Sequence, residues 1–412
     1  MPSRRAFITG IEAVTPAGTG WKKTWESLLS GRSGIRPISL FKADDYRTRI
    51  AGEVADLEVS SFISEKLRAA TERFTHFALA ATRLALDDSR IAIPAGSVEA
   101  GIVVGCGMGG LPYFEQQAEL YARKGSRSIR PGSVPRIMPN AAAAHMAAQW
   151  KIRGHNVTLS TACSSGNHAV GTALDLIRTG RCRVVLCGGT ESLLSPMTFA
   201  AFDALHVMSD NNSRPAQACR PFDKNRDGFV MGEGAVIFVL EEAGHARERG
   251  ADVYAEVAGY GSSNGSHNIL AAEPDGLEMS QSMEAALRDA GAAPASIRYV
   301  HAHGTGTLNN DAAETLGIQK AFGTHAGKLM VSSTKAVTGH MLGAAGALGI
   351  LACALSIKTG WVAPTLNYET PDPACALDYV PNKPRESSVD AALSNAFAFG
   401  GNNATIVIRR EA

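Results

Sequence analysis

Apolar residues along the chain occur in two alternating patterns. Short continuous runs predict buried strands, at residues 100–105, 183–189 and 235–241. Longer stretches with apolar positions three or four residues apart predict helices, at residues 21–30, 65–89 and 138–150. Because strands keep alternating with helices of crossover length, the pattern predicts an α/β fold with mostly parallel sheets.

The order of these patterns repeats within the chain. Three later segments resemble three earlier ones in the same order: 254–261 with 6–13, 298–306 with 101–109, and 331–346 with the segment from Thr158. We therefore predict two related halves, residues 1–250 and 251–412. No low-complexity linker separates them, so we expect them to pack tightly. The first half carries an additional insertion, at about residues 111–140.

The overall composition is that of an ordinary globular protein. Hydrophobic residues make up 45% of the 412 positions, and charged residues make up 19%. Lys and Arg number 40 against 39 Asp and Glu, so a general affinity for nucleic acids is not expected. Seven cysteines without a CxxC pair are typical of a reduced, cytoplasmic protein. We also expect no membrane association, because no signal segment or bilayer-spanning stretch is evident.

Cys163 is the first candidate for chemistry. It lies at a turn of small residues, between a short β-type run and a stretch with helical periodicity that reaches Ile177. The partial positive charge at a helix N-terminus favours thiolate over thiol, and the thiolate is the nucleophile. A buried thiol that only fills space is the alternative.

Two histidines follow an apolar run in the second half. His301 and His303 lie two residues apart, so a strand would direct both side chains to the same face. A metal site is not predicted, because no third ligand stands at a usual spacing. His303 precedes a Gly/Thr loop and is a candidate for a catalytic hydrogen bond. Asp311 and Glu314 occupy positions that are typical of helix caps.

The strand-to-turn pattern occurs a second time, ahead of a helix predicted over residues 341–358. Lys335 lies near the position equivalent to the nucleophile, in an apolar stretch that requires a buried partner such as Glu314. His340 opens the predicted helix, where the helix N-terminus disfavours a protonated ring. A Gly/Asn turn at residues 393–403 offers backbone N–H groups that could hold an anion.

Five motifs stand in order along the chain. They are Thr-Ala-Cys-Ser-Ser-Gly at 161–166, Arg-Pro-Phe-Asp-Lys-Asn-Arg-Asp-Gly-Phe at 220–229, His-Gly-Thr-Gly-Thr at 303–307, Ser-Thr-Lys-Ala-Val-Thr-Gly-His at 333–340 and Asn-Ala-Phe-Ala-Phe-Gly-Gly at 395–401. Together they resemble the β-ketoacyl-acyl-carrier-protein synthases, most closely the type II elongating condensing enzymes. The resemblance covers nearly the whole chain. It implies a thiolase-like fold, in which two duplicated halves form a five-layered αβαβα stack, and usually a homodimer.

The resemblance implies a condensing reaction and assigns its central groups. Cys163 would accept an acyl chain from a carrier thioester, with the backbone N–H groups of Cys163 and Phe399 as oxyanion hole. His303 and His340, both neutral, would hold the malonyl thioester while CO₂ leaves. The resulting carbanion equivalent would then attack the acyl group on Cys163. No metal or redox cofactor is implied, because the substrates arrive on the phosphopantetheine arm of an acyl carrier protein and decarboxylation drives the new bond.

The other implied site residues surround these groups. Lys335, together with Glu314, would orient the two histidines. Thr305 and Thr307 would contact the pantetheine arm, and Phe399 would also gate the entrance. The remaining substrate contacts are expected at Met108, Thr198, Phe202, Phe397 and Gly400.

Several positions depart from the family pattern. Ala398 replaces a glycine of the gating loop. Gly349 stands where many members carry a glutamate near a structural cation, so the sequence does not decide whether that ion site is kept. Thr198 lies in a segment that is usually richer in glycine, and its bulk would shorten or reshape the acyl tunnel. The loop from Asn268 lacks a threonine that often contacts pantetheine. These differences favour a specialised branch, such as polyene, secondary-metabolite or unusual-lipid elongation, beside housekeeping fatty-acid synthesis.

The implied carrier protein is acidic, so a basic surface should receive it. A basic cluster in the insertion is the candidate: Arg123, Lys124, Arg127, Arg130 and Arg136. Ordinary surface charge is the alternative explanation of this cluster. The chain could pair with itself or with a chain-length-factor-like subunit.

Three other functions compete with this interpretation. A non-catalytic or weakly catalytic partner subunit of a heterodimeric ketosynthase is the main one, although chain-length factors lack the nucleophile that Cys163 supplies. The glycine run at 105–110 suggests a nucleotide-binding oxidoreductase, but its spacing is wrong and no matching acidic residue follows. Thiolases that act on coenzyme A thioesters normally use a second cysteine as base, where this chain has two histidines.

Overall fold

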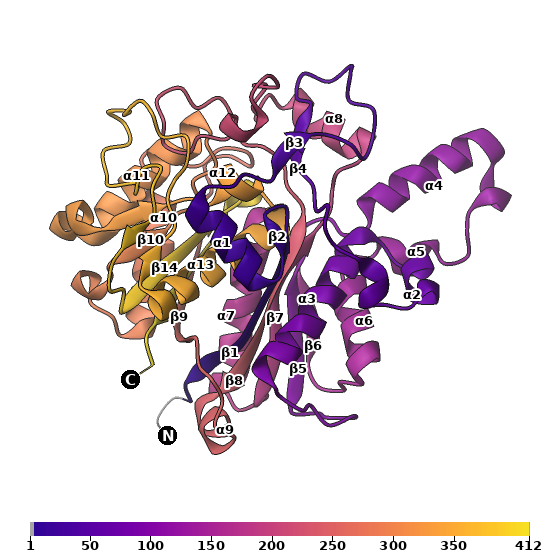
Figure 1. The fold of residues 1–412 in the computed structure, drawn as a ribbon, viewed down its shortest axis with the longest axis horizontal. Coiled ribbons are helices and arrows are strands. Elements are labelled where there is room, and N and C mark those ends of the chain that lie inside the picture. The colour runs from indigo at the N-terminus through magenta and orange to yellow at the C-terminus, as the bar shows by residue number, and fades with distance from the viewer. Residues whose placement is uncertain (1–3, 412) are drawn as a thin grey trace.

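The computed structural model describes residues 4–411, which form two sets of strands flanked by helices (Figure 1). The first half contains β1 (Ala6–Thr15), β2 (Gly18–Thr19), α1 (Trp21–Ser30), β3 (Ile35–Pro37), β4 (Ile50–Gly52), α2 (Glu65–Ala70), α3 (Arg73–Ser89), β5 (Ala100–Gly105), α4 (Leu111–Lys124), α5 (Ser133–Ile137), α6 (Ala141–Trp150), β6 (Asn156–Leu159), α7 (Ser165–Arg178), β7 (Val184–Glu191), α8 (Pro196–Ala204), β8 (Gly234–Glu242) and α9 (Ala243–Glu248). The second half contains β9 (Ala255–Asn264), α10 (Leu277–Ala290), β10 (Tyr299–His301), α11 (Leu308–Phe322), β11 (Met330–Ser332), α12 (Lys335–Thr338), α13 (Ala345–Thr359), β12 (Trp361–Val362), β13 (Arg385–Glu386), β14 (Ala391–Phe397) and β15 (Asn402–Arg409).

The two halves share one strand order. In the first half the order is β1-β8-β7-β5-β6, and in the second it is β9-β15-β14-β10-β11. In each half the last three strands are parallel and the first two pair in antiparallel fashion. Three residues of β1 pair with β9 and join the two sets into one mixed sheet. The predicted α/β class is confirmed, and the boundary predicted at residue 250 falls between α9 and β9.

The strands and helices are arranged in layers. Strand residues alternate between two cores, as Ile102 and Val104 on β5 pack against α3 and α6, whereas Val103 packs against α7 and α13. Helices α3 and α6 thus form one outer layer, and α7 and α13 form the central layer. Helices α10 and α11 form the second outer layer, which packs against the second set of strands. The central helices α7 and α13 approach closely, because a Cβ on Gly166 would lie only 2.8 Å from the backbone N of Ala347.

The repeated turn lies seven residues later than the sequence comparison places it. Ala162 and Leu342 each adopt a positive φ, of 48° and 47°, three residues before α7 and α13 begin. The counterpart of Cys163 is therefore Gly343, and Lys335 instead begins the short helix α12. The sequence comparison missed this shift because the second half inserts α12 between its strand and its turn.

One helical stretch is apolar and long enough to cross a bilayer, contrary to our expectation. It is Leu342–Thr359, with a mean hydropathy of 1.6, and 89% of it is buried inside the fold. Its apolar character is explained by its position as α13, in the central layer between the two sets of strands.

The predicted insertion forms a separate arm. Helix α4 projects from the body of the molecule, and the chain returns through α5 (Figure 1). The arm carries partly exposed apolar side chains along its length: Phe114, Tyr121, Ile129 and Val134. No equivalent arm stands between β10 and β11, where α11 packs against α10 within the described residues.

Candidate active site

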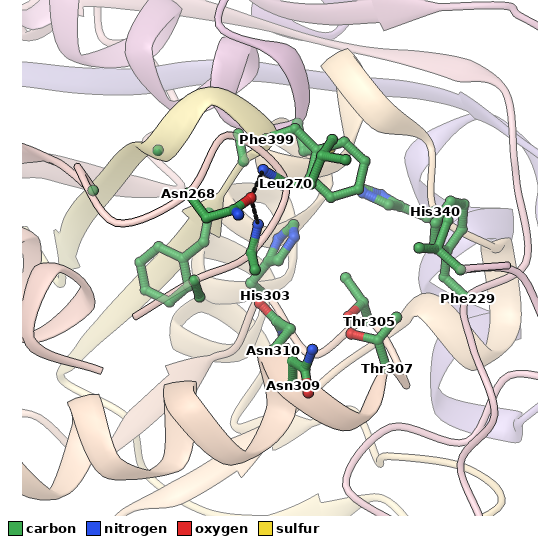
Figure 2. Close-up of a pocket in the computed structure, with 18 of the residues that line it drawn as sticks. Phe229, Asn268, Leu270, His303, Thr305, Thr307, Asn309, Asn310, His340 and Phe399 are labelled. Atoms are coloured by element: carbon green, nitrogen blue, oxygen red, sulfur yellow. Dashed lines mark hydrogen bonds between the residues drawn. The ribbon is translucent and has the colours of Figure 1, made fainter. Parts of the chain in front are cut away.

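A cavity of about 300 Å³ lies where the loops that follow β10 and β14 meet the turn before α7. Eight of the residues expected from the sequence line it: Cys163, Phe202, His303, Thr305, Thr307, His340, Phe397 and Phe399. Figure 2 shows His303 and His340 on different sides of this space, with Thr305 and Thr307 between them at its lower edge. Groups from both halves of the chain therefore meet in one cavity.

Cys163 lies in the 3₁₀ turn Ala162–Ser164, and it is the only one of the seven cysteines that is not buried. Burial of the sulfur in the cavity nevertheless raises its pKa to about 12. The charge of Lys335 and the backbone N–H groups of Cys163 and Phe399 act in the opposite direction. The expected favourable effect of backbone N–H groups on the thiolate is therefore present, but in the free protein the effect of desolvation is larger.

The Gly/Asn turn supplies one backbone donor to this sulfur. Gly400 and Gly401 adopt positive φ values of 83° and 76°, which turn the chain sharply between β14 and β15. Their N–H groups donate to the carbonyls of Ile269 and Ala398, at 2.7 and 3.1 Å. The N–H of Phe399 is the group that points to Cys163. The predicted anion-holding turn thus contributes a single N–H here.

The two candidate histidines are neutral. The rings of His303 and His340 stand 5.3 Å apart at an interplanar angle of 80°. Burial lowers the pKa of each ring well below its usual value, and the charge of Lys335 lowers it further. The neutral state expected for His340 agrees with its lowered pKa, but the cause differs. Helix α13 begins only at Ala345, so burial rather than the helix N-terminus lowers the pKa of this ring.

Two buried carboxylates hold the loop that carries His303. Glu314 accepts hydrogen bonds from the backbone N–H groups of His303 and Gly304, both at 2.8 Å. Asp311 accepts from the N–H groups of Thr305 and Gly306, at 3.1 Å each. Burial raises the pKa of Glu314 to about 7. These residues are therefore loop anchors rather than the simple helix caps that their positions suggested.

Lys335 is buried, and its ammonium donates to the backbone carbonyl of His303. The expected ion pair with Glu314 is not formed, because no carboxylate among residues 4–411 lies within 4.0 Å of Lys335 Nζ. Burial lowers the pKa of Lys335, and Glu314 opposes that effect at longer range. Lys335 thus supports the position of His303 through its backbone and places a positive charge near the cavity.

Glu191 was missed in the sequence. It ends β7, is fully buried, and accepts hydrogen bonds from the N–H groups of Gly107 at 2.7 Å and Gly343 at 3.3 Å. Its carboxylate thereby ties the loop after β5 to the turn that is the counterpart of Cys163. An acidic residue two positions after a buried apolar run was the signal that could have revealed it.

The loop after β9 forms one wall of the cavity. Asn268 Oδ1 accepts from the N–H of Leu270 at 2.7 Å and of Ala271 at 3.3 Å, as drawn in Figure 2. Asn309 and Asn310, at the start of α11, add amide groups to the same mouth. These two residues were not singled out in the sequence, although only Leu308 separates them from the His-Gly-Thr-Gly-Thr motif.

Three expected substrate contacts lie outside the lining of this cavity. Met108 is partly exposed on the loop after β5, and Thr198 is buried within α8. Gly400 bonds to Ile269, while its neighbour Gly401 lines the cavity. Their assignment as substrate contacts stays a prediction.

The basic cluster of the arm does not reach the cavity either. Arg136 bonds to Glu72, with Nε 2.7 Å from Oε1, and its guanidinium stacks 3.9 Å from the ring centre of Tyr113. Lys124 and Arg127 are exposed. Arg136 therefore holds the arm to the body, and only the exposed members are available to a partner.

Known proteins resemble this chain over its whole length. The family model "Beta-ketoacyl synthase, N-terminal domain" matches residues 3–246, and the model "Beta-ketoacyl synthase, C-terminal domain" matches residues 254–369. The 3-oxoacyl-[acyl-carrier-protein] synthase 2 of Synechocystis sp. is 40% identical over 411 residues, which covers 100% of this chain and 99% of that protein. The enzyme of the same name from Coxiella burnetii is also 40% identical, with the same coverage.

Two solved structures are similar in fold and sequence. The ishigamide ketosynthase/chain length factor superposes with a TM-score of 0.94 at 34% identity, with 100% of both chains covered. A type II polyketide ketosynthase in complex with its acyl-carrier protein superposes with a TM-score of 0.90 at 31% identity, also with 100% of both chains covered. This chain therefore belongs to the β-ketoacyl synthase family of condensing enzymes.

Proposed function

We propose that this chain is an acyltransferase that extends an acyl chain by decarboxylative condensation with a malonyl group on an acyl carrier protein. One observation carries the proposal. A single cavity of about 300 Å³ brings together Cys163, the N–H groups aimed at its sulfur, and the two neutral rings of His303 and His340. These are the nucleophile, the oxyanion donors and the hydrogen-bond donors that such a reaction requires.

The first step transfers the acyl group to the protein. The sulfur of Cys163 attacks the thioester carbonyl of an acyl carrier, and the N–H groups of Cys163 and Phe399 hold the oxyanion. The carbon–sulfur bond to pantetheine breaks, and the pantetheine sulfur leaves with the proton that Cys163 gives up. Because burial raises the pKa of Cys163 to about 12, we infer that this proton leaves within the bound complex rather than before binding.

The second step forms the new carbon–carbon bond. The neutral rings of His303 and His340 donate hydrogen bonds to the malonyl thioester carbonyl as CO₂ departs, which stabilises the enolate charge. The enolate carbon attacks the acyl carbonyl on Cys163, the carbon–sulfur bond to Cys163 breaks, and the Cys163 thiolate that leaves takes up one proton from solvent. The proposed reaction uses only the phosphopantetheine arm of the carrier and no further cofactor.

The mouth of the cavity suits such an arm. Thr305 and Thr307 line it, with their hydroxyl oxygens 2.9 Å apart, and Asn309 and Asn310 extend the polar rim. The loop from Asn268 faces them across the opening (Figure 2). We infer that these hydroxyl and amide groups guide the amides of pantetheine, and that the protein acts in the cytoplasm, where carrier substrates are made.

The assembly we propose is a homodimer. The arm of α4 and α5 exposes apolar side chains, and β6 is the outermost strand of the first set, with Asn156 exposed at its start. A second copy would cover both features. The similarity to a ketosynthase/chain length factor supports a heterodimer as the second possibility. In either case the Cys163, His303 and His340 set favours the catalytic role over that of a silent subunit.

Intact-mass spectrometry tests the proposal. The protein is incubated with acyl carrier proteins loaded with different chains, and then with malonyl carrier protein. We expect an acyl adduct on Cys163 that disappears as the β-ketoacyl carrier forms. Cys163→Ala should give no adduct, whereas Cys182→Ala, which removes a buried thiol outside the cavity, should behave like the wild type. An adduct that appears only after a second ketosynthase-like subunit is added would favour the heterodimer.

A further inference from the structure

A buried polar cluster lies beside the catalytic loop, between β10, β14 and α13. His301 stands two residues before His303 and is 2% exposed. The strand register places it directly between Ser332 on β11 and Ser394 on β14. Its Nε2 lies 3.1 Å from Oγ1 of Thr334. His301 is therefore fixed by the sheet on one side and by the turn before α12 on the other.

Gly349 on α13 faces this ring directly. A Cβ built on Gly349 would lie 2.7 Å from Nδ1 of His301 and 2.6 Å from Oγ of Ser394. Glycine is unfavourable inside a helix, and α13 is otherwise rich in alanine and leucine. The imidazole explains the glycine, because no larger residue fits while the ring occupies this position.

The residues present do not fit the structural cation that many family members hold near the position of Gly349. Hard cations take several oxygen ligands, usually including carboxylates. The two unbonded polar atoms that face Gly349 are Nδ1 of His301 and Oγ of Ser394, so only one of them is an oxygen. The side chain of Asn395 is already bonded to Glu314 and Thr405, at 3.2 and 3.0 Å.

We propose that the imidazole of His301 replaces this cation and acts as a positioning residue for the catalytic loop. Its Nε2 holds Thr334, which directly precedes Lys335, and Lys335 in turn donates to the carbonyl of His303. Two hydrogen bonds and the peptide bond between Thr334 and Lys335 thus link the buried ring to a catalytic histidine. The structure therefore needs no bound cation at this place.

The charge state of the ring agrees with this role. Burial and the nearby Lys335 lower the pKa of His301 to about 3, so the ring is neutral at ordinary pH. A protonated ring would instead place a second positive charge beside Lys335. The neutral ring keeps the space filled and the turn held without adding charge to the site.

Thermal unfolding of the wild-type protein, without any substrate, tests whether the fold is stable without a bound cation. The full chain is freed of metal ions and unfolded in KCl, NaCl and choline chloride at equal ionic strength. A bound cation would stabilise the folded state by mass action. We expect the same unfolding midpoint in all three salts. A midpoint that rises with KCl or NaCl but not with choline chloride would overturn the proposal. This result holds whether or not the chain catalyses the proposed condensation.

A double variant gives the complementary measurement. His301→Asn with Gly349→Glu removes the ring and supplies a carboxylate in the freed space. We expect its unfolding midpoint to rise with KCl and to fall below that of the wild type in choline chloride. If the double variant folds and its unfolding midpoint does not change with KCl, the proposal that the imidazole replaces a cation is contradicted. If this variant does not fold, the wild-type salt series still decides the question.

Kinetics of single variants test the positioning role, which rests on the proposed function. The side chain in His301→Gln can place an amide nitrogen near the position of Nε2 and keep the bond to Thr334, whereas His301→Leu cannot. For malonyl carrier decarboxylation we expect kcat to fall about tenfold or more in the leucine variant, with KM nearly unchanged. Glutamine should restore most of the rate. Equal losses in both variants at equal folded fraction would show that the ring only fills space.

Discussion

The turn at Cys163 and its counterpart at Gly343 have the same backbone but different surroundings. The residues before them, Ala162 and Leu342, have nearly equal positive φ values of 48° and 47°. Cys163 opens into the cavity, whereas a Cβ on Gly343 would lie 2.7 Å from Oε2 of Glu191. Duplication of the fold thus supplied two equivalent turns, of which one presents a nucleophile and the other is closed by a buried carboxylate.

The second half contributes in another way. Its catalytic candidates, His303 and His340, lie before the closed turn, on the loop after β10 and beyond α12. Their positive neighbour Lys335 also acts on the sulfur in the first half. Under the proposed mechanism the first half carries the nucleophile, and the second half carries the groups that would stabilise the enolate together with the Phe399 N–H of the oxyanion hole.

The largest effect should come from removing the nucleophile. We expect Cys163→Ala to lower the condensation rate by about 10³-fold or more, because Cys163 is the only cysteine of the described residues that lines the cavity. Decarboxylation of malonyl carrier should persist, since it needs only the second half. Product formation and CO₂ release are measured separately. Loss of both activities in a folded variant would contradict the division between the halves.

Removal of His303 should have the opposite result, with decarboxylation lost and acylation of Cys163 kept. We expect His303→Ala to reduce decarboxylation by about 10²–10³-fold, the loss typical of a missing donor at a developing charge. Acylation of Cys163 should continue and be visible by intact mass. The matched control is His325→Ala, whose ring bonds to the backbone carbonyl of Ile297 away from the cavity. If His303→Ala abolished acylation as well, the ring would have a role in both steps.

A substitution at the closed turn should lower the stability of the fold rather than the rate of catalysis. Gly343→Ala places a Cβ against Glu191 and the backbone N of Gly107, at 2.7 and 2.8 Å. We expect a loss of about 1–3 kcal/mol in the free energy of unfolding, the usual cost of overpacking. Cys163→Ala, the same position in the first half, should lose much less. Denaturant unfolding of both variants measures the difference, and equal losses would argue against the closed turn.

The pH dependence of Cys163 reactivity tests how the second half acts on the first. With a pKa of about 12, only a small fraction of the sulfur is thiolate near neutral pH, and this fraction grows about tenfold with each pH unit. Alkylation by iodoacetamide should rise accordingly from pH 7 to 9.5. A plateau near pH 8 would show that the thiolate is already stabilised in the free protein. Lys335→Met removes the favourable charge, so its alkylation should be slower at every pH.

Much of the fold and the identity of the reacting groups could be predicted from the sequence. Periodicity and internal repetition were enough to predict the class and the related halves, and short motifs were enough to single out Cys163, His303 and His340. The pKa of Cys163 could not be predicted, because it depends on burial by segments distant in the sequence. The bonds of Glu314 and Glu191 to backbone N–H groups also depend on loops that meet only in the folded chain.

The smallest effect should come from the arm, which only the first half possesses. Lys124, Arg127 and Arg130 are exposed basic residues of the arm without an ion pair among the described residues, so they are available to an acidic carrier protein. Exposed charges contribute about 0.2–1 kcal/mol each. We therefore expect Lys124→Ser with Arg127→Ser to raise KM for the carrier thioester by about two- to fivefold and to leave kcat unchanged, with a smaller effect at high salt because exposed charges are screened. Lys328→Ser, an exposed charge in the corresponding connection of the second half, should leave KM unchanged. If the control shifts KM as much as the arm variant, the attraction belongs to the whole surface, and the arm serves the contact between subunits instead.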